Sequence, residues 1–423
     1  MSATEPVSPT TGTRRPRTVA DRLGLPALRG HGLFVTGNLI DSVGNGMLLP
    51  LGLLYFTDVQ GLPLAQVGAA MTAGQALALP VTFLAGRLMD RVGPRRVVVW
   101  ANVLSAVGFA LFLLARAPWH IAAVYVLVQA GINMYFTAQR TLITHVTRAG
   151  ERRAWFAFTG SLRNVGLAAG SAAAAGALTV FGNGSLRWMI AVDAATYLLA
   201  AACFAALPTT PPEPDAAPPG APVARADHTR RYFLLVAVNL PYVLAQAVLA
   251  VLVAVYTTRA LGLPASAASM LFVINTAIVS ACSTVVTAHV APKEPRRAVA
   301  VGYLILTVGM AVFALPALPR AAATAWVALI AAITLFSVAE ILLGPALSEL
   351  SVSLTPQAAG GFTQGLYQFS WAVGMVAAPA LFTLLLEAGP LYPWGAEAAA
   401  CLIGALAAPA LRPANRHRRR NQN

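Results

Sequence analysis

Charged residues are scarce in this chain of 423 residues: Asp, Glu, Lys and Arg together make up 10%, whereas 57% is hydrophobic. An ordinary soluble domain carries about 25% charged residues. The mean hydropathy of +0.68 therefore excludes a typical soluble globular protein. We expect the chain to fold with the hydrocarbon of a lipid bilayer as its surroundings.

Cysteine and lysine are rare too. The three cysteines lie inside apolar stretches, where a thiol packs as a small hydrophobe, so no disulfide is predicted. The six histidines are scattered and form no H-E-x-x-H pair, so no metal site is predicted. Lys293, the sole lysine, precedes Glu294, which excludes a G-K-[ST] phosphate loop. We predict no metal, no cofactor, no enzymatic activity and no ATP-driven pump of that type.

Long apolar windows are what the chain does contain. A helix needs roughly 20 mostly apolar residues to cross the hydrocarbon core, and windows of that kind recur along the sequence, bounded by charge, Pro or Gly. Twelve spans are predicted, at residues 33–57, 64–89, 97–115, 119–142, 156–181, 188–207, 232–256, 266–289, 298–318, 321–347, 362–386 and 394–411. The predicted fold class is all-α, integral to the membrane.

The basic residues indicate the orientation. With both termini on one side, all but four of the 29 Lys and Arg residues fall on that side. The four exceptions are Arg116, Arg187, Arg259 and Arg320. Because cytoplasmic loops retain positive charge, both termini are predicted to be cytoplasmic. The bases flank membrane segments, so the pI of 10.6 predicts no nucleic-acid partner.

The organisation along the chain is predicted to be bipartite. Residues 1–30 are expected to form a disordered tail, 31–207 a first six-helix bundle and 232–411 a second. The Pro- and Ala-rich segment 208–231 is predicted to link them, and 412–423 to form a basic tail near anionic lipid. A weak repeat supports the division: Pro-Arg-Arg at residues 94–96 recurs at residues 295–297, without the acidic and glycine positions that precede the first copy.

The loop between the second and third spans carries a specific motif, G-R-L-M-D-R-V-G-P-R-R at residues 86–96. This sequence resembles the G-x-L-x-D-R-x-G-x-R signature of major facilitator superfamily (MFS) transporters. The resemblance implies two six-helix bundles with a solute site between them near the membrane midplane. The motif residues predicted to act at the cytoplasmic gate are Gly86, Asp90, Arg91, Gly93, Arg95 and Arg96.

Asp90 is the acidic member of this motif. In proteins that the chain resembles, this Asp lies near the start of helix eleven, where the helix dipole favours a carboxylate. The resemblance therefore implies a conformational latch. The alternative is a loop salt bridge to Arg91 or Arg95.

Asp41 is the leading candidate for proton coupling. Asn38 and Asn45 share its helix face at i−3 and i+4. An unpaired carboxylate in hydrocarbon costs at least about 2.5 kcal/mol, which favours its protonated form. Such a group can take up a proton on one side and release it on the other. The alternative is a permanent ion pair with Arg140 or Arg163.

Glu340 and Asp193 are two further acids within predicted spans. The surroundings of Glu340 resemble a Gly-Glu and Pro pattern of some bacterial drug exporters, and a second proton-coupling role is predicted for it. The alternative for Glu340 is a gate salt bridge to Arg297 or Arg140. Asp193 matches a common Asp-Ala of exporters, but its helix is usually peripheral in the family, so we interpret it as a packing residue.

Gly166 and Gly170 follow the G-x-x-x-G spacing that lets helices pack closely. Drug:proton antiporters of the superfamily carry G-x-x-x-G-P-x-x-G-G in this helix. Here Ser171 stands in the proline position, and Ala174 and Ala175 replace the closing glycines. The antiporter signature is therefore half present.

Polar residues recur at helical spacing in several spans, as is typical of a cavity or of interhelical hydrogen bonds. Together they predict a moderately polar cavity suited to a neutral or cationic amphiphile. The cavity candidates are Asn38, Asn45, Gln129, Asn133, Asn239, Tyr242, Gln246, Gln364, Tyr367, Gln368 and Trp371.

The predicted function is proton-coupled export of small hydrophobic or amphiphilic compounds, resembling the twelve-helix bacterial drug:proton antiporters. The alternative is an importer or exchanger of a nutrient such as a sugar or organic acid. The expected partners are a small-molecule substrate, protons and the lipid of a bacterial plasma membrane, with the chain acting as a monomer. A channel or sensor would show a repeated pore signature or an appended soluble domain, and neither is visible in the sequence.

Overall fold

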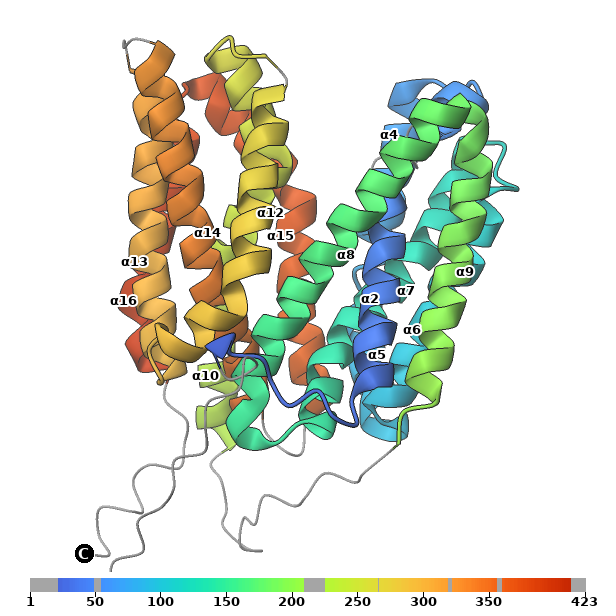
Figure 1. Ribbon diagram of the computed structural model, residues 1–423, viewed down its shortest axis with the longest axis horizontal. Helices are drawn as coiled ribbons and strands as arrows, with labels where there is room; N and C mark the ends of the chain where they lie inside the picture. The colour runs from blue at the N-terminus through green and yellow to red at the C-terminus, as the bar shows by residue number, and fades with distance from the viewer. Residues whose placement is uncertain are drawn as a thin grey trace, which may run out of the picture.

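The structure is a computed structural model that describes residues 22–48, 55–208, 225–264, 266–318, 322–355 and 360–411. These residues form helices and short connections, with no strand among them (Figure 1). The predicted tails up to residue 21 and from residue 412, and residues 209–224 of the predicted linker, lie outside the described residues. The all-α prediction is confirmed.

The first half of the chain forms a group of helices that pack on one another. Its α-helices are α2 (Gly32–Leu48), α4 (Leu64–Leu77), α5 (Val81–Val92), α6 (Pro94–Phe112), α7 (Pro118–Val146), α8 (Arg152–Phe181) and α9 (Ser185–Ala205). A π-helical turn, η1 (Tyr55–Val59), precedes α4. Pro94 and Pro118 each occupy the first turn of their helix, where a missing backbone N–H costs nothing.

The second half repeats this arrangement. Its α-helices are α10 (Arg225–Ala247), α11 (Val253–Val255), α12 (Ser266–His289), α13 (Pro295–Ala314), α14 (Ala322–Ser353), α15 (Gly360–Ala388) and α16 (Tyr392–Ala407). The π-helical segments η4 (Val248–Leu252) and η5 (Tyr256–Ala260) continue α10 and α11.

Each of the twelve predicted spans coincides with helix in the described part of the chain. Nine of these helices, with α4 and α5 counted as one, are long and apolar enough to cross a bilayer. The other three predicted spans correspond to α2, to the α10–η5 run and to α16.

Helix ends differ from the predicted spans where polar residues continue a helix into water. Helix α10 begins at Arg225, inside the segment predicted as linker, and α14 extends to Ser353. A hydropathy window detects only the apolar part of a helix, so such extensions escape it. Pro241 lies within α10 without ending it, and the irregular π-helical turns begin seven residues later, at Val248.

Each half has its own apolar core. In the second half one cluster joins Tyr256, Phe313 and Trp394, with Phe313 stacked on Trp394 at a ring-centroid distance of 4.8 Å. The buried clusters of the first half are separate from it, one around Phe109 and Tyr197 and the other around Trp155. Separate cores allow each half to keep its shape when the two move relative to each other.

The two halves lie close together at one end of the molecule and apart at the other (Figure 1). At the close end α5 packs against α15, and α8 packs against α12 and α14. We call this end, which carries Asp90, Gly361, Arg153 and Glu349, the contact end, and the opposite end the splayed end.

The repeated Pro-Arg-Arg sequences perform the same structural task in both halves. Arg95 donates hydrogen bonds to the carbonyl oxygens of Leu207 (2.6 Å) and Ala205 (3.3 Å), at the C-terminal end of α9. Arg296 donates to the carbonyl of Pro409 (3.4 Å), just beyond α16. Each arginine thus holds the end of the last helix of its own half, as expected for a cation at a helix C-terminus.

Candidate functional site

The contact end is built on a close crossing of α5 and α15. A methyl group placed on Gly86 would overlap the carbonyl of Gly361, and one placed on Gly361 would overlap that of Gly86. One turn further, a methyl on Gly365 would lie 2.6 Å from the carbonyl oxygen of Thr82. Only glycine permits this backbone approach.

Asp90 lies at this crossing. Its Oδ1 accepts a hydrogen bond of 2.6 Å from the backbone N–H of Gly361, in the first turn of α15. A carboxylate is favoured at that helix end by the helix dipole and by the free N–H groups. The alternative ion pairs with Arg91 or Arg95 are not formed in the described part of the chain, where Arg95 instead binds the end of α9.

The other motif residues lie around the same turn. Gly93 ends α5 with φ of 84°, a conformation that favours glycine. Arg91 and Arg96 are exposed. The structure therefore places the whole motif at the contact end.

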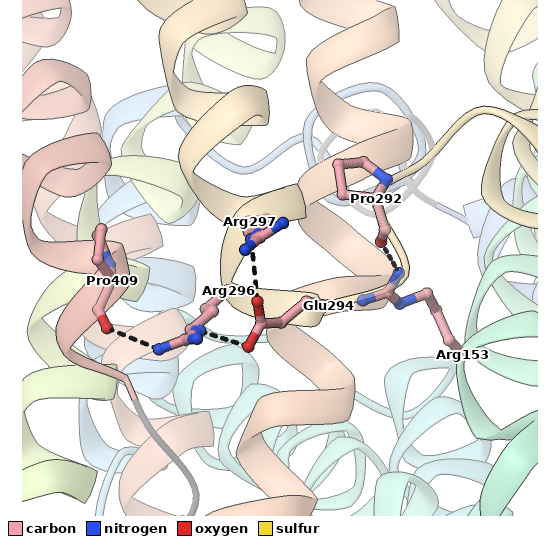
Figure 2. A network of polar contacts seen from close by, with 6 residues as sticks. All are labelled: Arg153, Pro292, Glu294, Arg296, Arg297 and Pro409. Atoms are coloured by element: carbon pink, nitrogen blue, oxygen red, sulfur yellow. Dashed lines mark hydrogen bonds and ion pairs between the residues drawn. The ribbon is translucent and has the colours of Figure 1, made fainter.

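A second polar contact joins the halves near the first. Arg153 on α8 forms an ion pair of 2.7 Å with Glu349 on α14, and it also donates a hydrogen bond to the carbonyl of Pro292. Glu294 lies nearby and pairs with Arg296 (2.6 Å) and Arg297 (3.0 Å), within the second half (Figure 2). Arg153 is thus the residue of this network that crosses between the halves.

We expect charge reversal at Arg153 to weaken the contact end. Arg153→Glu replaces a partly buried attraction by a repulsion worth about 1 kcal/mol, and the double variant Arg153→Glu with Glu349→Arg should restore it. Spin labels at the exposed Arg148 and Ser353 would report the separation of the halves. The control is Arg297→Glu, whose side chain is 75% exposed. Equal behaviour of the single and double variants would show that this pair does not hold the halves together.

Asp41 lies inside the first half, 5% exposed. Asn45 donates to its Oδ2 at 3.4 Å, and Asp41 forms no ion pair in the described part of the chain. The Arg163 guanidinium instead covers the ring of Phe136, 4.8 Å from the centroid. Arg140 hydrogen-bonds to Gln368. The alternative ion pairs of Asp41, with Arg140 or Arg163, are therefore not formed in the described residues.

The asparagines that flank Asp41 are engaged with other helices of the first half. Asn38 accepts hydrogen bonds from Tyr135 (2.9 Å) and Gln139 (2.5 Å) on α7, and Asn45 accepts one from Tyr197 (3.0 Å) on α9. Beside them is a small polar pocket of about 10 Å³. Its lining includes Asp41, Asn45, Asn102, Ser105, Tyr135 and Tyr197.

Gly166 and Gly170 pack α8 against α2 next to Asp41. A methyl on Gly166 would lie 2.5 Å from Cβ of Ser42, and one on Gly170 would overlap the carbonyl of Val43. Ser171, which stands in the proline position of the antiporter signature, donates to the carbonyl of Gly46 at 2.9 Å. The half-present signature thus positions the helix that carries Asp41.

Glu340 lies on α14 in the second half, among polar and aromatic side chains. Its Oε2 accepts a hydrogen bond of 2.9 Å from Asn275 on α12. Gln246 donates to the hydroxyl of Tyr242 (2.9 Å), and Tyr242 meets Trp371 edge to face at 5.6 Å. The suggested salt bridges of Glu340 with Arg297 or Arg140 are not formed in the described residues, because Arg297 pairs with Glu294 and Arg140 binds Gln368.

Several predicted cavity residues are buried and form hydrogen bonds between helices. Gln368 on α15 accepts from Arg140 (3.2 Å) and donates to Asn133 (3.5 Å), both on α7, so this cluster joins the halves. Tyr367 donates to Asn239 (2.9 Å), and its ring lies under the Arg140 guanidinium, 4.6 Å away.

The remaining two cavity candidates lie apart from that cluster. Gln364 donates to the carbonyl of Ser351 (2.8 Å) and is 1% exposed. Gln129 is partly exposed on α7, one turn before Asn133. Nine of the eleven candidates therefore form three groups, one around Asp41, one around Glu340 and one at the junction of the halves, and Gln129 and Gln364 lie outside them.

A larger pocket lies elsewhere in the described residues. It has a volume of about 360 Å³ and is lined mainly by apolar residues of η4, α11, η5 and the end of α15, with Glu387 among them. None of the predicted cavity residues lines it.

Sequence reasoning missed several polar residues of the interior. Asn275 was not predicted as a site residue, because a single Asn in an apolar span belongs to no recognisable motif. Glu397 on α16 is 2% exposed and accepts a weak hydrogen bond from the thiol of Cys401 at 3.6 Å. Its place within a predicted span was the signal that could have identified it, as it did for Asp193.

Comparison with known proteins agrees with this architecture. The profile of the Major Facilitator Superfamily matches residues 34–379 and 235–423. The multidrug resistance protein MdtH of Edwardsiella ictaluri is 25% identical over 346 residues, covering 80% of this chain and 81% of that protein. An uncharacterized MFS-type transporter, YhjO of Bacillus subtilis, is 27% identical over 179 residues, 42% of this chain and 43% of its own.

Solved structures share the fold. The fucose:proton symporter FucP of E. coli superposes with a TM-score of 0.71 at 14% identity, covering 90% of this chain and 98% of the symporter. The human organic anion transporter MFSD10 gives a TM-score of 0.66 at 17% identity, with 91% and 100% covered. With two helical halves, the loop motif at their crossing and a profile match along nearly the whole chain, this protein belongs to the major facilitator superfamily of membrane transporters.

Proposed function

We propose that the chain is a proton-coupled exporter of small hydrophobic or amphiphilic compounds that works by alternating access in a bacterial plasma membrane. The observation that carries the proposal is Asp41: a buried carboxyl group on α2 that has no ion-pair partner in the described residues. A membrane-embedded acid in that setting is costly to ionise and is suited to bind and release a proton.

The orientation follows from charge. The positive-inside rule places the contact end, with Arg91, Arg96 and Arg148, on the cytoplasmic side. The described arrangement is then closed to the cytoplasm and splayed toward the outside. FucP has also been solved in an outward conformation, and that structure superposes with a TM-score of 0.68 at 15% identity. Asp90 and the Arg153–Glu349 pair would be contacts made in this state and broken in the inward-facing one.

The substrate class rests on the chemistry near Glu340 and on the relatives. Tyr242 and Trp371 offer aromatic surfaces, and Glu340 offers a carboxylate, a combination that suits an amphiphilic cation. MdtH is named a multidrug resistance protein. The nutrient importer remains the alternative, because it would use the same fold and the same proton site.

The test is transport by the purified chain in liposomes that contain a pH-sensitive dye. On adding a lipophilic cation such as ethidium, we expect proton movement with wild type and at least about a tenfold smaller rate with Asp41→Asn, since the variant cannot carry the proton. Asp90→Asn serves as a control for the gate, because it lies far from the polar pocket around Asp41.

Three outcomes would contradict parts of this proposal. Proton movement unchanged by Asp41→Asn would transfer the coupling role to Glu340. Proton movement driven by a sugar or organic acid, and by no lipophilic cation, would favour the nutrient carrier. Substrate movement that ignores an imposed pH gradient would exclude proton coupling.

A further inference from the structure

Asp193 is the acid whose surroundings fit a packing role least. It lies on α9 with no exposed surface, and neither carboxyl oxygen has a hydrogen-bond partner in the described part of the chain. Thr196 donates a hydrogen bond of 2.7 Å to the backbone carbonyl of Asp193, with its hydroxyl close to the carboxyl group. A buried polar group without a partner costs free energy that packing alone does not offset, so its presence needs an explanation.

Its position relative to Asp41 supplies one. A methyl group on Gly44 of α2 would lie 2.5 Å from Oδ1 of Asp193, so this carboxyl rests on α2 one turn after Asp41. One turn further along α9, the hydroxyl of Tyr197 donates to Asn45, which in turn donates to Asp41. The contact of α2 with α9 therefore holds two carboxyl groups, and hydrogen bonds link one of them, Asp41, to Asn45 and Tyr197.

The small pocket beside Asp41 adjoins this contact, although Asp193 does not line it. Its volume of about 10 Å³ matches the space that one water molecule needs. Asp41 and Tyr197 line it, and so does Asn102, which is 1% exposed and whose Oδ1 has no hydrogen-bond partner in the described residues. An unpaired acceptor and a carboxyl group facing one small pocket are the surroundings a proton-carrying water requires.

We propose that Asp193 is a second proton-binding site of the first half, which exchanges its proton with Asp41 across the contact of α2 with α9. In the exchange a proton leaves one carboxylic acid and joins the other carboxylate, so one proton serves both groups. Two carboxylates there would repel each other, whereas one neutral acid near one carboxylate avoids that repulsion. The proposal extends the proposed function, since it assumes that Asp41 exchanges protons.

Few other titratable groups face this contact. Tyr197 on α9 and Tyr135 on α7 interact electrostatically with Asp41, and Arg163 on α8 does so from a greater distance than an ion pair. Helix α6 contributes Asn102 and Ser105 to the pocket, and its two arginines lie at its start, at the contact end. Asp41 is therefore the charged group of this contact that acts on Asp193.

The test is infrared spectroscopy of the full chain in lipid, recorded from acidic to alkaline pH. The C=O stretch of a protonated carboxyl group disappears when the group ionises. We expect one C=O band to belong to protonated Asp193, so it should be lost in Asp193→Asn. In wild type this band should weaken as pH rises. The pH at which half of it is lost should change by about one pH unit in Asp41→Asn, because interacting sites titrate together. The matched control is Glu397→Gln, which removes an equally buried acid of the other half and should leave that midpoint unchanged.

The experiment also separates this inference from the proposed function. An Asp193 component that stays constant at every pH, that is absent at every pH, or that ignores Asp41→Asn would overturn the inference even if transport requires Asp41. A titrating Asp193 in a chain that moves no protons with any substrate would leave the inference standing and reject the exporter. If Asp193→Asn does not fold, aspartate labelled with ¹³C at its carboxyl carbon separates the aspartate bands of wild type from those of Glu340 and Glu397.

Discussion

Gly86→Leu is expected to prevent closure of the contact end and to abolish transport. The backbones of α5 and α15 touch at Gly86 and Gly361, with no room for even a methyl group. A leucine there forces the helices apart at a cost of about 3 kcal/mol, which corresponds to a shift on the order of 100-fold away from the closed arrangement. The hydrogen bond from Gly361 to Asp90 would be lost with it.

The measurement is the distance between spin labels at Arg148 and Ser353, in a chain whose three cysteines are replaced by alanine. The distance distribution should shift toward wide separations in Gly86→Leu, with transport falling in parallel. Gly68→Leu is the matched control, because it lies in the same membrane span and has open space around it. A wild-type distance distribution in Gly86→Leu would show that the crossing does not determine closure.

Gly170→Leu is expected to destabilise the first half and to displace Asp41, the proposed proton site. Helix α8 meets the backbone of α2 at this residue, where a methyl would overlap the carbonyl of Val43 and lie 2.9 Å from the N of Met47. The added side chain must displace α2 and with it Asp41. We expect a loss of about 3 kcal/mol, seen as a Tm lower by roughly 5 to 10 °C in thermal unfolding.

Gly176→Leu provides the comparison on the same helix. Gly176 is exposed, and a side chain built there meets nothing within 4 Å. Its Tm should stay within about 1 °C or 2 °C of wild type, since exposed substitutions usually change stability by less than 0.5 kcal/mol. Equal losses of Tm in both variants would mean that the helix, and not its contact with α2, is sensitive to the change.

The sequence predicted the helices well because the bilayer imposes one strong rule. A segment must be apolar over roughly 20 residues to cross it, whatever its neighbours are. The loop motif was equally informative, since Gly86 and Asp90 lie at the crossing of α5 with α15. Both features depend on residues that are close together in the chain.

Partners across the structure were not predictable in the same way. Hydropathy indicates how deep a residue lies in the membrane, but not toward which helix it points. Gln364 and Asn239 share the pattern of cavity residues, yet they bond to Ser351 and Tyr367. The pair of Arg153 with Glu349 joins residues almost 200 positions apart, and no local pattern specifies it. The alternative for Glu340, a salt bridge to Arg297 or Arg140, rests on charge alone, whereas the fold brings Glu340 to Asn275.

The arginines that hold the ends of α9 and α16 have a consequence for the speed of a transport cycle. Arg95 and Arg296 hydrogen-bond to the chain at the ends of α9 and α16. These contacts link the last helix of each half to its neighbours and favour movement of each half as a rigid body. Rigid-body motions of this size take microseconds to milliseconds. Their rate depends on the lifetime of the contacts between the two halves. The rate at which the halves separate and meet should therefore respond more to substitutions on the surface between them than to substitutions within one half that leave its packing and Asp41 unchanged.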